Sequence, residues 1–338
     1  MKLEIGIVGL PNVGKSTLFK LLTKQDILVA NYPFATIDPN VGIVPVPDER
    51  LAKLAALSQS KKTIPAVVEF YDIAGLVKGA NKGEGLGNQF LTHIRETQAV
   101  VMVLRVFESA EIIHVENTVD PLRDLEILNT ELALKDLETV ERRLAKAEAE
   151  ARTGKKEAAQ DKELLTTIKS LLEAGTLPVS RAEVMEALRA NARMHDLNLL
   201  TAKRQIYLLN GSEGDVSDAL KLKIKDMGAD FVIVDLATAT DVSDLIRKAY
   251  EVLNLESFFT TGEDETRAWT IEKGTKAPQA AGVIHTDFEQ KFIRLEVVSC
   301  GKLLEAGGWN QAKQKGWIRL EGKDYVVQDG DVIVVRHG

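Results

Sequence analysis

The segment at residues 9–17, GLPNVGKST, has the residue types and spacing of a loop that binds phosphate groups. It matches G-x-x-x-x-G-K-[ST] in full and directly follows a strand-like apolar run, which is the expected context. Two glycines let backbone N–H groups close around phosphate oxygens, the lysine places its charge on the β and γ phosphates, and the serine binds Mg²⁺. The predicted nucleotide-binding residues here are Asn12, Val13, Gly14, Lys15, Ser16 and Thr17.

A second loop with suitable chemistry comes about twenty residues later. Residues 31–42 read NYPFATIDPNVG, and the two prolines predict an extended loop. Thr36 lies in it, and we expect its hydroxyl to complete the Mg²⁺ coordination when a γ-phosphate is present.

The stretch DIAGLVKGANKGEGLG, residues 72–87, has the pattern Asp-x-x-Gly of a nucleotide switch. Asp72 is expected to hold Mg²⁺, and the Gly75 amide to contact the γ-phosphate. The next position often carries a glutamine that orients the attacking water. Here it is Leu76, which can neither donate nor accept a hydrogen bond, so another group must orient the water or the intrinsic reaction is slow.

The sequence NGSE at residues 210–213 falls where guanine-specific switches carry Asn-Lys-x-Asp. In such switches the aspartate accepts hydrogen bonds from guanine. Glu213 is one methylene longer, and Gly211 replaces the lysine whose stem flanks the base, so guanine selection is weakened. We expect Asn210 and backbone groups to read adenine, which favours ATP over GTP.

Composition narrows the class of protein. The chain has 338 residues, 45% of them hydrophobic and 28% charged, with a net charge of −7. These values are typical of a globular protein of two or three domains, with no overall field that attracts nucleic acid. The single cysteine, Cys300, excludes an internal disulfide and a cysteine-rich zinc site, and we expect its side chain to be buried or half-buried. No apolar run is long enough for a membrane helix, and no signal peptide is evident, so we expect a cytoplasmic protein.

Five apolar runs must position these loops. They are residues 3–10, 66–72, 99–106, 205–210 and 230–237, and they alternate with helical patterns. Continuous apolar runs are typical of parallel strands that are buried on both faces. We therefore predict a doubly wound α/β domain whose ligands bind at the carboxyl ends of the strands.

Two further regions flank this pattern. Residues 124–151 lack glycine and proline and repeat apolar residues at spacings of four and three; after TGKK at 153–156 a second stripe begins. This predicts an antiparallel helical hairpin inserted in the α/β domain. Residues beyond about 255 predict a small α+β domain rich in strands, in which Asp329-Gly330 is expected to form a hairpin turn.

The motifs and their order resemble the YchF/Obg-like ATPase family of P-loop switch proteins. The stretches that carry the resemblance lie at residues 9–19, 31–42, 72–91, 93–97, 129–143, 267–294 and 321–333. The resemblance implies a P-loop NTPase domain with a doubly wound, mostly parallel sheet, an inserted coiled-coil hairpin and a C-terminal TGS domain of β-grasp type. We place these at 1–128 with 202–254, at 129–201, and at 255–338. It also implies hydrolysis of ATP rather than GTP and association with the ribosome.

Two features bear on how closely the family pattern applies. The stretch 211–245 is shorter than expected, and DLATA at 235–239 lacks a clear Ser-Ala signature of the loop that contacts the base. A hydrophobic residue in place of the switch glutamine is shared by a branch of P-loop switches. His114 is therefore a candidate for binding the hydrolytic water, because histidine can take a proton near neutral pH.

Together these observations predict a monomeric, Mg²⁺-dependent P-loop ATPase with slow intrinsic turnover. Lys15, Thr36, Gly75 and His114 are the expected catalytic residues, and Ser16, Thr36 and Asp72 the expected metal ligands. The expected partners are ATP and the ribosome, through its large subunit and ribosomal RNA. Two alternatives remain open: a GTPase of the same architecture, and a non-hydrolysing module that uses bound nucleotide to set domain geometry.

Overall fold

The computed structural model describes residues 3–23, 41–72, 94–109 and 118–338. Thr36, Gly75, Leu76 and His114 lie outside these ranges. The remaining predicted site residues lie inside them.

Within the described residues, six strands form the first sheet, in the order β2-β4-β1-β5-β6-β7. The five predicted apolar runs all form strands here, and they are parallel to one another. A sixth strand that the sequence pattern did not predict, β2, pairs antiparallel with β4 at the edge. The strands are β1 (Glu4–Val8), β2 (Val41–Pro45), β4 (Val67–Asp72), β5 (Ala99–Arg105), β6 (Arg204–Asn210) and β7 (Asp230–Val234).

Helices cover both faces of this sheet, as the continuous apolar runs predicted. One core contains side chains from α1 (Lys15–Thr23) and α8 (Ser243–Val252). The other contains side chains from the first third of α4 (Pro121–Ala151) and from α7 (Asp218–Asp226). All seven residues of β5, at the centre, are buried.

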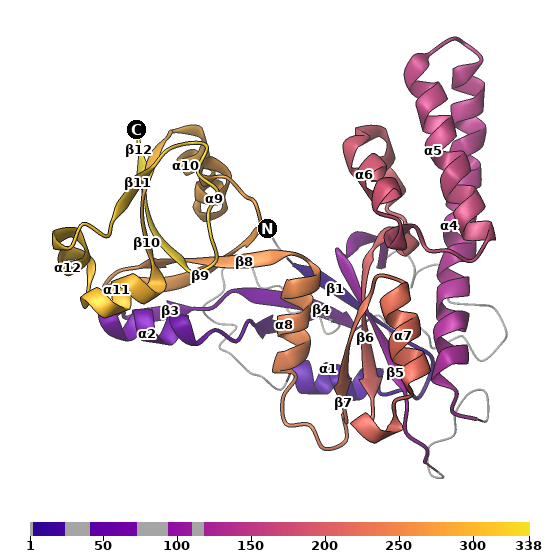
Figure 1. The fold of residues 1–338 in the computed structure, drawn as a ribbon, viewed down its shortest axis with the longest axis horizontal. Coiled ribbons are helices and arrows are strands. Elements are labelled where there is room, and N and C mark those ends of the chain that lie inside the picture. Colours follow the sequence, from indigo (N-terminus) through magenta and orange to yellow (C-terminus); the bar gives the residue numbers. More distant parts are fainter. Residues whose placement is uncertain (1–2, 24–40, 73–93, 110–117) are drawn as a thin grey trace.

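The inserted region forms the predicted antiparallel helical hairpin. α4 packs along α5 (Lys156–Glu173), and the short helix α6 (Ala182–Ala190) follows. Ala133, Val140 and Ala147 of the predicted stripe are buried in the core of the hairpin, opposite Leu165 and Ile168. The predicted boundary at residue 128 falls inside α4, which begins on the first sheet and continues without a break into the hairpin. Figure 1 shows the hairpin extending away from the sheet, with the α4–α5 turn at its far end.

A second sheet of six strands in the described residues has the order β11-β10-β12-β8-β9-β3. Its strands are β3 (Lys62–Ile64), β8 (Leu255–Thr261), β9 (Glu265–Glu272), β10 (Phe292–Ser299), β11 (Arg319–Glu321) and β12 (Asp331–His337). The helices of this region are α9 (Ala277–Ile284), α10 (Thr286–Gln290), α11 (Cys300–Ala306) and α12 (Trp309–Gln314). Cys300 is buried, as predicted.

The predicted hairpin at Asp329-Gly330 is wrong. A turn does form, because the Asp331 N–H donates to the Gln328 carbonyl, but the residues before it do not pair with β12. The turn instead bonds to two distant elements: Gly330 donates to the Ser257 carbonyl of β8 and accepts from the Cys300 N–H at the start of α11, each at 2.8 Å. β12 therefore lies between β8 and β10, and these long-range bonds override the local turn signal.

The second sheet also contains a segment from the first third of the chain. After β2, the chain forms α2 (Glu49–Ser58) and then β3, which pairs parallel with β9. Only then does it return to the first sheet as β4. The segment that connects β2 to β4, two neighbouring strands of the first sheet, thus contributes a strand to the second sheet.

Candidate functional site

The predicted phosphate-binding loop lies between β1 and α1, at the carboxyl end of the central strands. Asn12 has φ 62° and Gly14 has φ 110°, so the loop turns through left-handed backbone just before the helix begins at Lys15. The Leu18 N–H donates to the Gly14 carbonyl at 2.9 Å, which starts the helical ladder. The amides of the first turn then have no partner within the helix and carry its positive dipole end, which is the arrangement that binds anions.

Lys15 lies along this loop rather than in solvent. Its side chain is 8% exposed, and its ammonium group donates to the Leu10 carbonyl. Ser16 and Thr17 are exposed on the first turn of α1, and Val13 is fully buried beneath them. The residues predicted from the motif thus lie together on one loop, with Ser16 and Thr17 exposed and Val13 and Lys15 buried.

The two motif glycines are required by close packing. A Cβ on Gly9 would lie 2.6 Å from the Val103 carbonyl oxygen of β5. A Cβ on Gly14 would lie 2.4 Å from the amide nitrogen of Asn210. Because the loop presses this tightly on β5 and β6, larger residues at either position would displace it.

Asn210, predicted to contact the base, is 5% exposed and bonds within the protein. Its Nδ2 donates to the Val13 carbonyl at 2.9 Å, and its Oδ1 accepts from the Leu236 N–H at 3.0 Å. One donor and one acceptor position of the amide are therefore used to hold the loop against the segment that follows β7. Leu236 lies in the stretch DLATA named above, but its contact with the Asn210 amide was not predicted, because only the fold brings it beside residue 13.

The other base-side predictions fall on a short turn after β6. Gly211 has φ 153°, and a Cβ there would lie 2.6 Å from Val106. Glu213 begins a 3₁₀ turn, η7 (Glu213–Asp215), and its side chain is 72% exposed and ion-paired with Lys221 of α7. The structure thus places Gly211 against the residues that follow β5, whereas Glu213 faces α7.

Asp72 ends β4, and in the register of the first sheet it pairs with Ile7 of β1. The backbone at Asp72 therefore lies beside Ile7, which is two residues before Gly9. It is at the same end of the sheet as the phosphate-binding loop. Among the described residues, no group of three or more His, Cys, Asp or Glu side chains could hold a metal. Mg²⁺ instead uses few protein oxygens together with phosphate oxygens, and the exposed hydroxyl of Ser16 at the start of α1 is an oxygen of that kind.

Arg105, at the carboxyl end of β5, was not singled out from the sequence. It is fully buried, its Nε donates to the Phe107 carbonyl at 3.0 Å, and its guanidinium lies 4.6 Å from the Phe107 ring centroid. The adjacent Val106 N–H donates to the Asn210 carbonyl. Arg105 therefore fixes the chain as it leaves the sheet towards residues 110–117.

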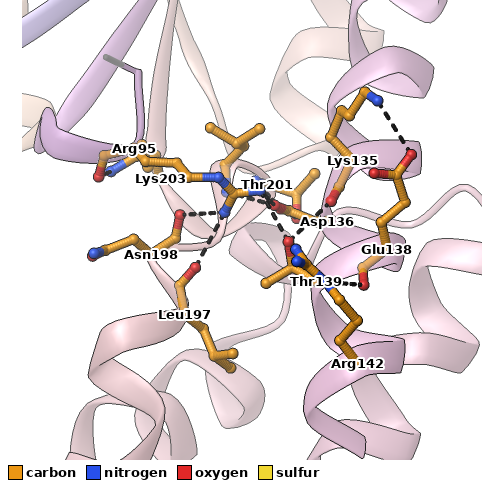
Figure 2. Close-up of polar contacts among 11 residues, drawn as sticks. Arg95, Lys135, Asp136, Glu138, Thr139, Arg142, Leu197, Asn198, Thr201 and Lys203 are labelled. Carbon is orange, nitrogen blue, oxygen red and sulfur yellow. Dashed lines mark hydrogen bonds and ion pairs between the residues drawn. The ribbon is translucent and has the colours of Figure 1, made fainter. Parts of the chain in front are cut away.

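A buried polar cluster joins the base of the hairpin to the first sheet (Figure 2). At its centre Asp136 of α4, fully buried, accepts from the Leu200 and Thr201 N–H groups and from the Thr201 hydroxyl. Arg95 lies 3.5 Å from this carboxylate and donates to the Thr139 hydroxyl and to the carbonyls of residues 197 and 198.

Lys203 closes the cluster by donating to the Arg95 and Thr97 carbonyls. Burial, together with the nearby Arg95, lowers the pKa of Lys203 to about 8, although Asp136 opposes this shift. Sequence reasoning missed the cluster because its members lie on three separate segments.

The chain is similar to known proteins over its whole length. A family model named YchF-GTPase_C, described as a protein of unknown function, matches residues 255–338, and one described as "50S ribosome-binding GTPase" matches residues 4–141. The ribosome-binding ATPase YchF of Bacillus subtilis is 45% identical over 366 aligned positions, which cover 99% of each chain.

The chain belongs to the YchF family. The Obg-like ATPase 1 of Gallus gallus is 41% identical and is covered over 91% of its length. The solved structure of the Schizosaccharomyces pombe YchF GTPase matches with a TM-score of 0.84 at 38% identity, over 99% of this chain and 98% of that one. The resemblance stated from the motifs is thereby confirmed, as is the α/β fold with a P-loop domain and a C-terminal domain.

Among the described residues, no helix is both long enough and apolar enough to span a membrane.

Proposed function

We propose that this chain is a Mg²⁺-dependent ATPase that works as a ribosome-associated conformational switch. The observation that carries the proposal is the loop at the N-terminus of α1, with Lys15 packed along it and Ser16 exposed on its first turn. Membership of the YchF family, some of whose members are named ribosome-binding ATPases, supports both parts of the proposal.

The residues have distinct roles in this proposal. The amides of residues 13–17 and the Lys15 ammonium bind the phosphates and offset the charge that develops during hydrolysis. Ser16, Thr36 and Asp72 hold Mg²⁺, which supplies further charge neutralisation when bound. Gly75 contacts the γ-phosphate, and His114 positions the water in place of the glutamine that Leu76 replaces. We further propose the three-domain division and the TGS assignment that the family resemblance implies, and a cytoplasmic monomer.

The preference for ATP over GTP is supported by the surroundings of Glu213. Its carboxylate is paired with Lys221 and mostly exposed, so it is not held towards a guanine edge. Without a fixed carboxylate the hydrogen bonds that select guanine are lost, and that loss weakens discrimination strongly. A GTPase of the same architecture is the second candidate, because one matching family model and the S. pombe structure are both described as GTPases.

The proposal is tested by measuring nucleotide affinity and hydrolysis for wild type and Lys15→Ala. We expect tighter binding of ATP than of GTP, and a hydrolysis rate that falls at least about 100-fold in Lys15→Ala because a charged group at the phosphates is lost. Removing Mg²⁺ with a chelator should stop hydrolysis, and adding it back should restore it.

Lys20→Ala is the matched control, because Lys20 is an exposed lysine of the same helix. It should leave both measurements unchanged. Tighter binding of GTP would favour the GTPase, and equal hydrolysis in wild type and Lys15→Ala would favour the non-hydrolysing module.

A further inference from the structure

The turn between α4 and α5 carries a group of cations that form no ion pair with the described residues. Arg152, Lys155 and Lys156 fall within five residues and are all exposed. No acidic side chain of the described residues forms an ion pair with any of them, although Glu157 is exposed next to them in the chain. We call these three residues the tip cations.

The acidic side chains nearest the tip on α4 are engaged elsewhere. Glu150 pairs with Arg193 at 2.6 Å, and Glu148 pairs with Lys162 at 3.4 Å. The pKa of Glu150 is lowered mainly by its hydrogen bond from Arg193, with smaller contributions from the charges of Lys146 and Lys155. These carboxylates therefore stabilise the hairpin internally, and the net positive charge remains at its end.

The tip is also open and distant from the nucleotide loop. Gly154, between the cations, has φ 83°, and a Cβ there would meet no atom within 4 Å. The 31 residues of α4 make a helix about 46 Å long, and Figure 1 places the turn at its outer end. A contact at the tip can therefore be made without covering the phosphate-binding loop.

We propose that the tip cations bind the phosphate backbone of ribosomal RNA. This inference rests on the proposed ribosome association and names the surface that makes it. With a net charge of −7, the whole molecule does not attract RNA, so attraction must come from a local group of cations on an accessible element. The tip cations provide such a group, and each lysine or arginine that meets a phosphate releases a counterion.

The test compares ribosome binding by wild type and the triple variant Arg152→Ala, Lys155→Ala, Lys156→Ala across a series of salt concentrations. We expect the triple variant to bind purified ribosomes about tenfold more weakly, and its plot of log K against log salt to be flatter by about 2 to 3, because three phosphate contacts are lost. The substitution Arg152→Lys should keep the wild-type salt slope. Hydrolysis in the absence of ribosomes should be unchanged in both variants.

The matched control removes three exposed lysines of the second sheet's region, Lys302, Lys313 and Lys323. If this control weakens binding as much as the tip variant, or if the tip variant binds with wild-type affinity and slope, the proposal is overturned. If wild type itself does not co-sediment with ribosomes, the proposed partner is wrong, and so is the role proposed for the tip cations.

A different observation carries a second inference, at the base of the hairpin. Arg95 follows the Asp-x-x-Gly segment in the chain, and its guanidinium bonds to α4 through Thr139 and to the returning segment through the carbonyls of residues 197 and 198. Lys203, just before β6, bonds back to the Arg95 carbonyl. We infer that Arg95 is a positioning residue that couples the nucleotide state to the direction of the hairpin.

This second inference also rests on the proposed function. It is tested by the ratio of the ribosome affinities in two nucleotide states. Ribosome affinity is measured with a non-hydrolysable ATP analogue and with ADP, for wild type and for Arg95→Lys, which keeps the charge but cannot bond to all three partners at once. We expect the ratio of the two affinities to move towards one in the variant while nucleotide affinity without ribosomes stays the same. A merely structural role would lower stability and leave the ratio unchanged. An unchanged ratio, or a wild-type ratio of one, overturns the inference.

Discussion

Asn210 is the residue through which the phosphate-binding loop depends most directly on a distant part of the chain. Its amide joins the Val13 carbonyl to the Leu236 N–H, and its nitrogen would be 2.4 Å from any Cβ at Gly14. The last residue of β6 thus stabilises the conformation of the phosphate-binding loop. The sequence of the loop alone does not reveal this contact.

We expect Asn210→Ala to reduce both the free energy of unfolding and the affinity for ATP. The substitution leaves a buried carbonyl and a buried N–H without partners, and each such group costs about 1–3 kcal/mol. Chemical denaturation and ATP titration of the variant measure the two effects.

Glu213→Gln is the control for this substitution, because Glu213 is mostly exposed and follows the same strand. It should change stability by less than about 0.5 kcal/mol. Equal losses in the two variants would contradict the supporting role given to Asn210.

Lys203 gives the hairpin base a dependence on pH. Its pKa of about 8 in the folded chain lies below the value of about 10.4 for an unperturbed lysine. Between these values the unfolded chain binds more protons than the folded chain, so this residue makes the free energy of unfolding increase as pH rises from 8 to 10. Below pH 8 both states are protonated, and the penalty for burying the charge is fully present.

Urea denaturation of wild type and Lys203→Met at pH 7.5 and pH 9.5 measures this effect. The stability of wild type relative to the variant should increase with pH, because all other titrating groups are common to both chains. Parallel pH profiles for the two chains would show that the ammonium is not destabilised by burial.

At the scale of the elements, sequence periodicity predicted most of the first sheet and the hairpin. Parallel strands covered on both faces must be apolar throughout, so the runs at β1, β4, β5, β6 and β7 were readable from the chain. β2 was not predicted because it is an edge strand that buries only alternate residues, and β3 was not predicted because it has only three residues. The hairpin predicted at Asp329-Gly330 was wrong because β12 pairs with β10 and β8, which are distant in sequence.

The residues of the candidate site also fall into those that the sequence could predict and those that it could not. The phosphate-binding loop is contiguous in sequence, so its residues and their relative placement could be predicted from one motif. The support from Asn210 and Leu236, and the cluster around Asp136, bring together residues from separate segments. Spacing along the chain carries no signal for such contacts.

α4 belongs to two cores, and one pair of its residues tests this. Leu132 is fully buried against the first sheet, whereas Leu134, two residues later, is 52% exposed. We expect Leu132→Ala to lower the free energy of unfolding by about 2–5 kcal/mol, because it leaves a cavity, and Leu134→Ala by less than about 0.5 kcal/mol.

Hydrogen exchange would locate the effect of these substitutions. Faster exchange in α4, β5 and β6 of Leu132→Ala is expected, since one core spans all three elements. A variant whose destabilisation is confined to the hairpin would contradict this view of α4 as a helix continuous with the first sheet.

At the scale of the whole molecule, the second sheet is attached through the chain between β2 and β4. Arg50, at the start of α2, donates to both oxygens of Asp329, at 2.6 and 3.1 Å, and also bonds to Asp48. Burial works against ionisation of Asp329, but hydrogen bonds from Arg50 and from the Ser257 N–H outweigh it and lower its pKa. Movement of β2 relative to β4 would therefore be transmitted to the second sheet through α2 and β3.

A double-mutant cycle with Arg50→Met and Asp329→Asn measures the strength of this attachment. Two-pronged arginine–carboxylate pairs exceed ordinary surface pairs, so we expect a coupling free energy of about 1 kcal/mol in unfolding measurements. Lys61 and Asp264 form the matched control, because their ion pair joins the same two regions but is 75% and 91% exposed. That pair should couple by no more than about 0.3 kcal/mol. Equal coupling in the two cycles would mean that Arg50 is one surface contact among the several that join the two regions.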